Sequence, residues 1–313
     1  MINFRYHVVS LTAVFLALAI GLVVGTAALN GPVADSLKEN VNALRKDNQQ
    51  MRQAVNNLEE ELAREEDFAA EIAGVVLPGK LAGKRVLVLS LPTGRDHTEG
   101  VIKMLQLGGA DVVGRVDLQD KFINPDNNND LLELAVAAAR PTSAATANLP
   151  PNGHGVETSS ALLATVLLDR APGGTPVSEA DRRAVLAAYT NANYLTTSER
   201  VTASAEAVVV VSGQPYVDKD SAKKDESVVK VAEQFDRTGA IVVAGNGSAG
   251  GNLVAFVRGD AVLAESISTV DNANTVQGQL VTALTLVQQL TEKKAGQYGV
   301  GDSATSLLPR LPQ

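Results

Sequence analysis

The chain has 313 residues, 45% of them hydrophobic, which is enough for one large or two small folded domains and excludes a largely disordered protein. Its 27 basic and 35 acidic residues give a formal net charge of −8, and this balance argues against a nucleic-acid partner, which would require a basic face. It has no cysteine, so disulfides, thiolate metal sites and cysteine nucleophiles are excluded.

The N-terminal segment reads as a membrane anchor. Residues 8–29 carry no charge and are long enough to cross a bilayer as one helix. Arg5 precedes the apolar run and Asp35 follows it, which predicts a cytoplasmic tail at residues 1–7 and the bulk of the chain outside the cell membrane, in the periplasm or cell envelope. A cleaved signal peptide is the alternative, although the run exceeds the usual signal core. Small side chains at every fourth position predict a membrane dimer face at Ala13, Ala17, Gly21 and Gly25.

Residues 30–76 carry apolar side chains at alternating spacings of three and four, which predicts a parallel coiled coil. Valine at a positions with leucine at d positions favours two strands, and Asn48 at an a position would set the register and the dimeric state. An amphipathic helix packed on its own domain is the alternative. Ala69 and Ile72 continue the repeat beyond the predicted dimer seam, which consists of Leu37, Val41, Leu44, Asn48, Met51, Val55, Leu58 and Leu62.

The end of this helix is acidic, which weakens the seam. A charged residue stands at a d position, and two glutamates would face each other across the dimer. We therefore expect this end to fray or to bind a basic partner through Glu59, Glu61, Glu65 and Glu66.

Beyond Pro78 and Gly79 the periodicity predicts alternating strands and helices. This alternation is typical of an α/β fold with an open, mostly parallel, Rossmann-like sheet covered on both faces. We expect this extracytoplasmic domain over residues 77–294, with an exposed loop at 141–155 and a C-terminal tail at 295–313. The expected strands are 85–91, 111–116, 207–211, 240–244 and 253–257; the expected helices are 99–107, 130–140, 160–169, 178–189, 226–235 and 275–290.

One glycine-rich segment, residues 245–250, matches the dinucleotide-binding fingerprint and follows an expected strand. That fingerprint must open a helix whose N-terminus holds the pyrophosphate, whereas residues 252–258 read as a strand. We therefore interpret the segment as a hairpin turn, with nucleotide binding as the alternative.

Catalytic and metal-binding residues are sparse. The histidines are His7, His97 and His154, and the methionines beyond the initiator are Met51 and Met104, none at ligand spacing on a shared face. His97, beside Asp96, is the best candidate for a ligand or general base, but helix capping or solvent exposure explains it more simply. Ser90 and Ser212 end expected strands without a nucleophile elbow. The sequence therefore predicts neither an enzyme nor a bound cofactor.

The polar stretch at residues 266–275 precedes the last expected helix. Asn272 or Asn274 can cap that helix, and unpaired amides there could dock a partner carboxylate. The alternative is a plain capped helix at the sheet edge. The partner-binding candidates in this stretch are Asp271, Asn272 and Asn274.

Several segments together resemble the actinobacterial MctB/SteB family over essentially the full length. They are the N-terminal tail and span with the heptads, VVVVSG at 208–213, VAGNGSAGG at 243–251 and SISTVDNANTVQGQLVTAL at 266–284. The resemblance implies copper transport or an outer-membrane pore under one family name, and partnership with SteA in cell-wall remodelling at division under the other. A pore requires a closed barrel or several spanning helices, and this chain offers one span.

From these observations we expect a non-enzymatic, membrane-anchored homodimer that acts as a scaffold or regulator of cell-wall remodelling, through a SteA-like partner and cell-wall hydrolases. The alternative is a component of copper efflux and homeostasis, with copper implied by the resemblance only. Copper movement through one chain would lack the soft sulfur ligands that the metal favours.

Overall fold

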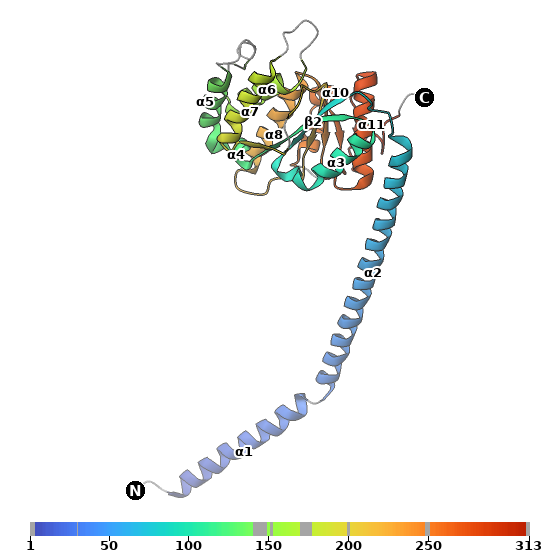
Figure 1. The fold of residues 1–313 in the computed structure, drawn as a ribbon. Helices are drawn as coiled ribbons and strands as arrows, with labels where there is room; N and C mark the ends of the chain where they lie inside the picture. The colour runs from blue at the N-terminus through green and yellow to red at the C-terminus, as the bar shows by residue number, and fades with distance from the viewer. Residues whose placement is uncertain are drawn as a thin grey trace. The chain divides into compact units, whose positions relative to one another are not determined.

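The computed structural model describes residues 4–29, 31–139, 149–150, 153–169, 177–198, 201–247 and 251–310. The chain divides into two compact units, Met1–Glu65 and Glu66–Gln313. The two units differ in kind, because the first consists of helix alone and the second is built around a sheet (Figure 1).

The first unit contains α1 (Phe4–Leu29) and most of α2 (Pro32–Val76). Within α1, Phe4–Ala27 has a mean hydropathy of 2.6. Its most apolar stretch is not buried against any other part of the described protein, as expected for a membrane span. Pro32 opens α2, where a proline's missing N–H costs no helical hydrogen bond. This confirms an N-terminal apolar helix followed by a second long helix.

The last turns of α2 belong to the second unit, and they correct the end of the coiled coil expected at residues 30–76. Ala69 is only 5% exposed, and Ala73 and, just after the helix, Leu77 are fully buried in the core of the domain. The apolar positions from Ala69 onward therefore pack on the domain itself and are not available to a second helix. Pairing of the preceding heptads stays a prediction.

The second unit is built on a sheet of seven strands in the order β3-β2-β1-β4-β5-β6-β7. Every neighbouring pair is parallel except β2 with β3, which is antiparallel. This confirms the expected open, mostly parallel, Rossmann-like sheet. The strands are β1 (Arg85–Ser90), β2 (Asp111–Leu118), β3 (Leu195–Thr197), β4 (Ala207–Val211), β5 (Ala240–Ala244), β6 (Ser268–Val270) and β7 (Gln297–Tyr298).

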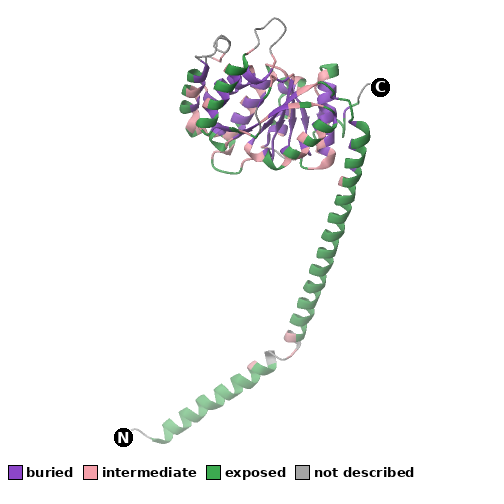
Figure 2. Ribbon diagram, viewed as in Figure 1, coloured by how far each residue is buried: buried purple, intermediate pink, exposed green. Residues whose placement is uncertain are grey.

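Helices cover both faces of the sheet, and the strands between them are almost entirely buried (Figure 2). The end of α2, α3 and α11 pack on one face, and α4 to α10 pack on the other. Central strands such as β4 are therefore apolar at successive positions. The helices are α3 (Arg95–Leu107), α4 (Asp120–Ile123), α5 (Asn128–Ala139), α6 (Gly155–Leu167), α7 (Glu179–Asn191), α8 (Ser221–Asp236), α9 (Leu253–Gly259), α10 (Ala261–Ser266) and α11 (Val276–Glu292).

The expected strand at 253–257 is wrong, because these residues form α9. Asn252 caps this helix through its Oδ1, which accepts a hydrogen bond from the Ala255 N–H at 2.8 Å. Leu253, Val254 and Val257 are buried on one side, as helical spacing requires.

Short strands were also missed at both edges of the sheet. The polar stretch at 266–275 contains β6, and the expected tail from 295 onward contributes β7. Residues 299–306 continue along β7, since Gly299 N–H donates to the Ser306 carbonyl and Thr305 N–H to the Gln297 carbonyl. The domain thus extends past residue 294. Most of the expected loop at 141–155 lies outside the described residues, and its last residue begins α6.

Candidate functional site

The sheet order reverses between β1 and β4, and in open α/β sheets ligands bind where the order reverses, outside the carboxyl ends of the strands. Here the loop that follows β1 and the loop that follows β4 contact each other. Gly94 and Gly213 allow this approach, because a Cβ at Gly94 would collide with the Val211 carbonyl and one at Gly213 with the Thr93 carbonyl. Gly213 N–H also donates to Thr93 Oγ1 at 3.1 Å. The backbones of these two loops are therefore in direct contact at the point where the strand order reverses.

Two titratable side chains near these loops, Tyr216 and Asp225, were not predicted as site residues from the sequence. Burial raises the pKa of the Tyr216 phenol, and burial, followed by the charge of Asp218, raises the pKa of the Asp225 carboxyl. Asp225 is only 8% exposed. Asp225 lies in the first turns of α8, close in sequence to lysines and an exposed aspartate. This pattern is typical of a solvated helix start, so the sequence did not indicate that the carboxyl is buried.

The serine and histidine candidates lie near the carboxyl ends of β1 and β4 without forming a catalytic arrangement. Ser90 is fully buried, and its hydroxyl accepts a hydrogen bond from Thr98 Oγ1 at 2.9 Å. Ser212 is 4% exposed and its backbone N–H donates to the Ala244 carbonyl. His97 and Asp96 lie in the first turn of α3, which Gly94 precedes without a side-chain cap. Ser90 ends β1 and Ser212 follows the neighbouring β4, beside the start of α3, but no hydrogen bond joins Ser90, Ser212 and His97 within the described residues.

The glycine-rich segment 245–250 precedes the helix α9 and not a strand. The argument from a following strand against nucleotide binding therefore fails. The loop is instead closed by a side chain: Asn252 Nδ2 donates to the Gly247 carbonyl at 2.7 Å and to the Asn246 carbonyl at 3.3 Å, while its Oδ1 caps α9. Residues 248–250 lie outside the described residues. A capped helix of seven residues is a poor match to the pyrophosphate site of the fingerprint.

Asp271, a predicted partner-binding residue, lies in the interior. Its carboxylate contacts Arg258 Nη1 at 2.7 Å, and the side chains of the two residues are 0% and 3% exposed. It also accepts hydrogen bonds from the N–H groups of Val300 at 2.8 Å and Gly301 at 3.1 Å. Arg258 further donates to the Tyr298 carbonyl at 2.6 Å and to Thr269 Oγ1 at 2.8 Å. This buried pair fastens the C-terminal segment to β6, so Asp271 is not available to a partner in this fold.

The two neighbouring asparagines take different positions. Asn272 is 7% exposed, whereas Asn274 is exposed. Neither caps α11: Thr275 is the N-cap, and its Oγ1 accepts from the Gly278 N–H at 3.1 Å. The expectation that an asparagine caps this helix is therefore wrong, although the capped start itself is present.

The residues with metal-binding chemistry are scattered. Among the described residues there is no group of three or more His, Asp and Glu side chains that could hold a metal ion. His154 is the N-cap of α6, and burial, followed by the charge of Lys230, lowers its pKa. Met51 is 61% exposed on α2, and Met104 packs against the core beneath α3.

The predicted dimer residues are exposed along the two long helices. In α1, the faces of Gly21 and Gly25 are open, because a Cβ added at either glycine would have nothing within 4 Å. In α2, the seam side chains include Leu44 at 67% and Leu58 at 63% exposure. The acidic residues Glu59, Glu61 and Glu65 are exposed and Glu66 is half-buried. A second copy would cover the seam, and its presence stays a prediction.

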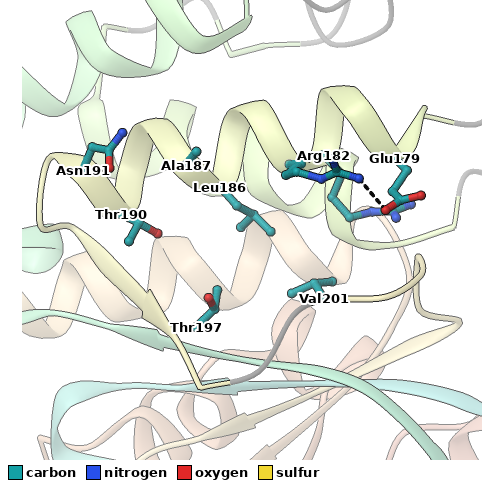
Figure 3. A pocket seen from close by; sticks show the side chains of 9 residues that line it. Glu179, Arg182, Leu186, Ala187, Thr190, Asn191, Thr197 and Val201 are labelled. Atoms are coloured by element: carbon teal, nitrogen blue, oxygen red, sulfur yellow. Dashed lines mark hydrogen bonds and ion pairs between the residues drawn. The ribbon is translucent and has the colours of Figure 1, made fainter.

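A pocket of about 260 Å³ lies between α7 and the edge strand β3, and no sequence pattern indicated it. Figure 3 shows Arg182 and Glu179 at one end of the pocket and Asn191 at the other, with Leu186 and Val201 between them. The lining combines apolar side chains with polar and charged ones, and it comprises Glu179, Arg182, Arg183, Leu186, Ala187, Thr190, Asn191, Thr197 and Val201.

Comparison with known proteins gives matches over nearly the whole chain. Residues 1–309 match a family model described as "Copper transport outer membrane protein, MctB". The chain is 29% identical to the copper transporter MctB of Mycobacterium leprae (strain TN), a match that covers 98% of this chain and 99% of that protein. It is also 29% identical to the copper transporter MctB of Mycobacterium tuberculosis (strain ATCC 25618 / H37Rv), with the same shares covered.

Proposed function

The chain belongs to the MctB family, and from this premise we propose that it is a membrane-anchored component of copper transport and copper homeostasis in the cell envelope. The observation that carries the proposal is the extent of the similarity. The matches to the curated copper transporters cover 98% of the chain, so they include both the apolar helix α1 and the sheet domain. The family likeness therefore concerns the complete arrangement of anchor, long helix and domain.

In this proposal α1 is retained as an anchor, with the N-terminus in the cytoplasm and the sheet domain in the envelope. The apolar span supports retention, and Arg5 on its N-terminal side supports the orientation. Because the chain has no cysteine, a single introduced cysteine at the domain surface would report the orientation without background. Labelling of intact cells by a membrane-impermeant thiol reagent is the expected result, and labelling only after lysis would contradict it.

The chain has three methionines, three histidines and no cysteine, so it supplies few of the soft ligands that copper favours. We therefore place its contribution in protein contacts, as a non-enzymatic component that positions copper-carrying partners or pairs with a second copy. Calorimetry of the purified full chain with copper tests whether the chain has a copper site of its own. Weak binding is expected, and stoichiometric tight binding would assign the metal site to this chain.

The copper role itself is tested in a host strain lacking the gene. The full chain, or a variant with α1 deleted, is returned to this strain, and growth in copper and cellular copper content are measured. The full chain should restore both, and the variant should fail because the domain is no longer held at the membrane. If the full chain changes neither measurement, the proposed role in copper homeostasis is wrong.

The exposed heptads of α2 favour a second candidate, a dimeric scaffold for cell-wall remodelling at division. Leu37, Leu44 and Leu58 remain more than half exposed, which suits a stalk that pairs with a second copy. The acidic end at Glu59 to Glu66 would then meet a basic, SteA-like partner or a cell-wall hydrolase. The same deletion strain, grown without added copper, separates the candidates, because chained or incompletely separated cells would support the scaffold alone.

A further inference from the structure

Arg182, in the pocket between α7 and β3, is a largely buried cation whose one hydrogen bond within the described residues comes from its Nε. The residue is only 6% exposed, and burial is the main cause that lowers the pKa of its guanidinium. Its Nε donates to the Val166 carbonyl at 3.0 Å, near the C-terminal end of α6. A guanidinium has five N–H donors, and no hydrogen bond from its two terminal nitrogens occurs within the described part of the chain. These two nitrogens are not among the fully buried side-chain atoms without a partner, and the residue lines the pocket.

The nearby carboxylates are each held by another arginine. Glu179 contacts Arg183 at 2.6 Å, and Asp169 contacts Arg85 at 2.7 Å. Both carboxylates still act on Arg182 at longer range and raise its pKa, while Arg85 lowers it. Arg85 also lies 3.8 Å from a second carboxylate, that of Glu206. Arg182 is therefore the arginine of this cluster for which the described residues show no ion pair, and it lines the end of the pocket.

The rest of the lining restricts what could meet that charge. Leu186, Ala187 and Val201 form an apolar middle, and Thr190 and Asn191 place a hydroxyl and an amide at the far end. A carboxylate is the anion whose two oxygens match the terminal nitrogens of a guanidinium. An apolar body would fill the middle of the pocket, and a polar group beyond it could hydrogen-bond at the far end.

We propose that this pocket binds a carboxylate carried on a short apolar body, with Arg182 as the group that recognises the carboxylate. An acylated amino acid has this chemistry, and so has the C-terminal residue of a peptide. The proposal is independent of copper and of the scaffold role, because it rests on Arg182 and the pocket alone.

The experiment uses the full chain in detergent and titrates it with N-acetyl-leucine, followed by calorimetry and by thermal melting in circular dichroism. N-acetyl-leucine amide, which has the same shape without the charge, is the matched control. A peptide ending in leucine, with a free or an amidated C-terminus, distinguishes a free small molecule from a protein terminus. We expect the carboxylates to bind at least ten times more tightly than the amides. Equal binding of acid and amide, or no binding of either acid, would overturn the proposal.

Two substitutions distinguish recognition from a structural role. Arg182→Met keeps an apolar stem of similar length and removes an incompletely paired buried charge, so it should fold with an equal or higher melting temperature and lose carboxylate binding. Arg183→Gln removes the neighbouring exposed charge and should leave binding within about twofold, because that arginine serves Glu179. If Arg182→Met melts well below the wild-type protein and the wild-type protein shows no preference for acid over amide, Arg182 is only a brace for α6.

Discussion

The two units of the protein treat apolar side chains in opposite ways. In the first unit Leu44 is 67% exposed and Leu16 is 62% exposed, whereas in the second Leu87 and Val209 have no exposed surface. Burial of such a side chain contributes roughly 1.5–3 kcal/mol, so the second unit is stabilised by its own core while the first gains almost nothing from its own chain. The difference predicts that lipid around α1 and a second copy of α2 would cover the apolar side chains that the first unit leaves exposed.

The largest effect should come from placing charges in α1, which should abolish membrane association. Replacing Leu16 and Ile20 of α1 with arginine costs about 2.5–3.5 kcal/mol for each charge at the middle of a bilayer. We expect the protein to leave the membrane fraction. Gln50→Arg with Gln53→Arg adds the same charges on the outer face of α2 and should leave it membrane-bound. Cell fractionation and immunoblotting measure both, and retention of the α1 variant in the membrane would show that α1 is not the anchor.

The next effect concerns the seam of α2. Val55→Asp with Leu58→Asp removes two apolar contacts from each chain, roughly 3–6 kcal/mol if both are buried in a dimer. The readout is the disulfide yield of Leu44→Cys in intact cells, which has no background because the chain lacks cysteine. Asn56→Asp with Asn57→Asp places the same charges on the outer face and should keep the cross-link. An unchanged yield in the seam variant would exclude the coiled-coil dimer.

The buried ion pair of the second unit should respond more strongly than an exposed one. Arg258→Ala leaves the carboxylate of Asp271 buried without its cation and should destabilise the domain by about 3–5 kcal/mol. Arg183→Ala breaks a pair whose side chains are 62% and 56% exposed, and its cost should be about 0–1 kcal/mol. Denaturant unfolding followed by circular dichroism compares them, and equal costs would refute the distinction.

A smaller effect tests the start of α11. Thr275→Ala removes the side chain that accepts from the Gly278 N–H and should cost about 1 kcal/mol. Asn274→Ala, next to it and exposed, should cost almost nothing. The same unfolding measurement applies. A larger loss from Asn274→Ala would restore the asparagine as the cap.

The smallest effect is a dependence of stability on pH through His154. Burial, then the charge of Lys230, lowers the pKa of this histidine from its ordinary 6.5, so the folded protein binds its proton less readily than the unfolded chain. The contribution of neutral His154 to the free energy of unfolding is complete above pH 6.5. It is lost as the pH falls through 6.5 towards the folded pKa. His154→Asn keeps a capping side chain that does not titrate, so its melting temperature should fall less between about pH 8 and pH 5. Equal losses in both proteins would exclude this histidine as a source.

Much of the second unit was predictable because its central strands are buried on both faces. The strand at 207–211 and the strand at 240–244 appear with the expected bounds, since runs of valine and isoleucine are typical of such strands. The short strands β3, β6 and β7 were not predictable, because two or three residues carry no periodicity and depend on a neighbour for their hydrogen bonds.

The candidate sites were less predictable than the fold. The segment 253–257 is rich in the residue types that strands favour, and the cap from Asn252 outweighed that preference. Asp271 stands in a polar stretch that reads as surface, yet Arg258, thirteen positions earlier in the chain, pairs with it in the interior. Arg182 follows the pattern of a charged helix face, and only the packing of α7 against α6 and β3 makes it a buried cation beside a pocket.

The sequence by itself determined the apolar helix, the long heptad helix and the alternation of strands and helices, because each depends on the spacing of apolar side chains along the chain. The tertiary structure alone decided where the repeat of α2 ends, which loops meet beyond the ends of β1 and β4, and which charges are buried. Burial and pairing depend on residues that are distant in sequence, so Ala69, Asp271 and Arg182 acquire their environments only when the domain closes around them.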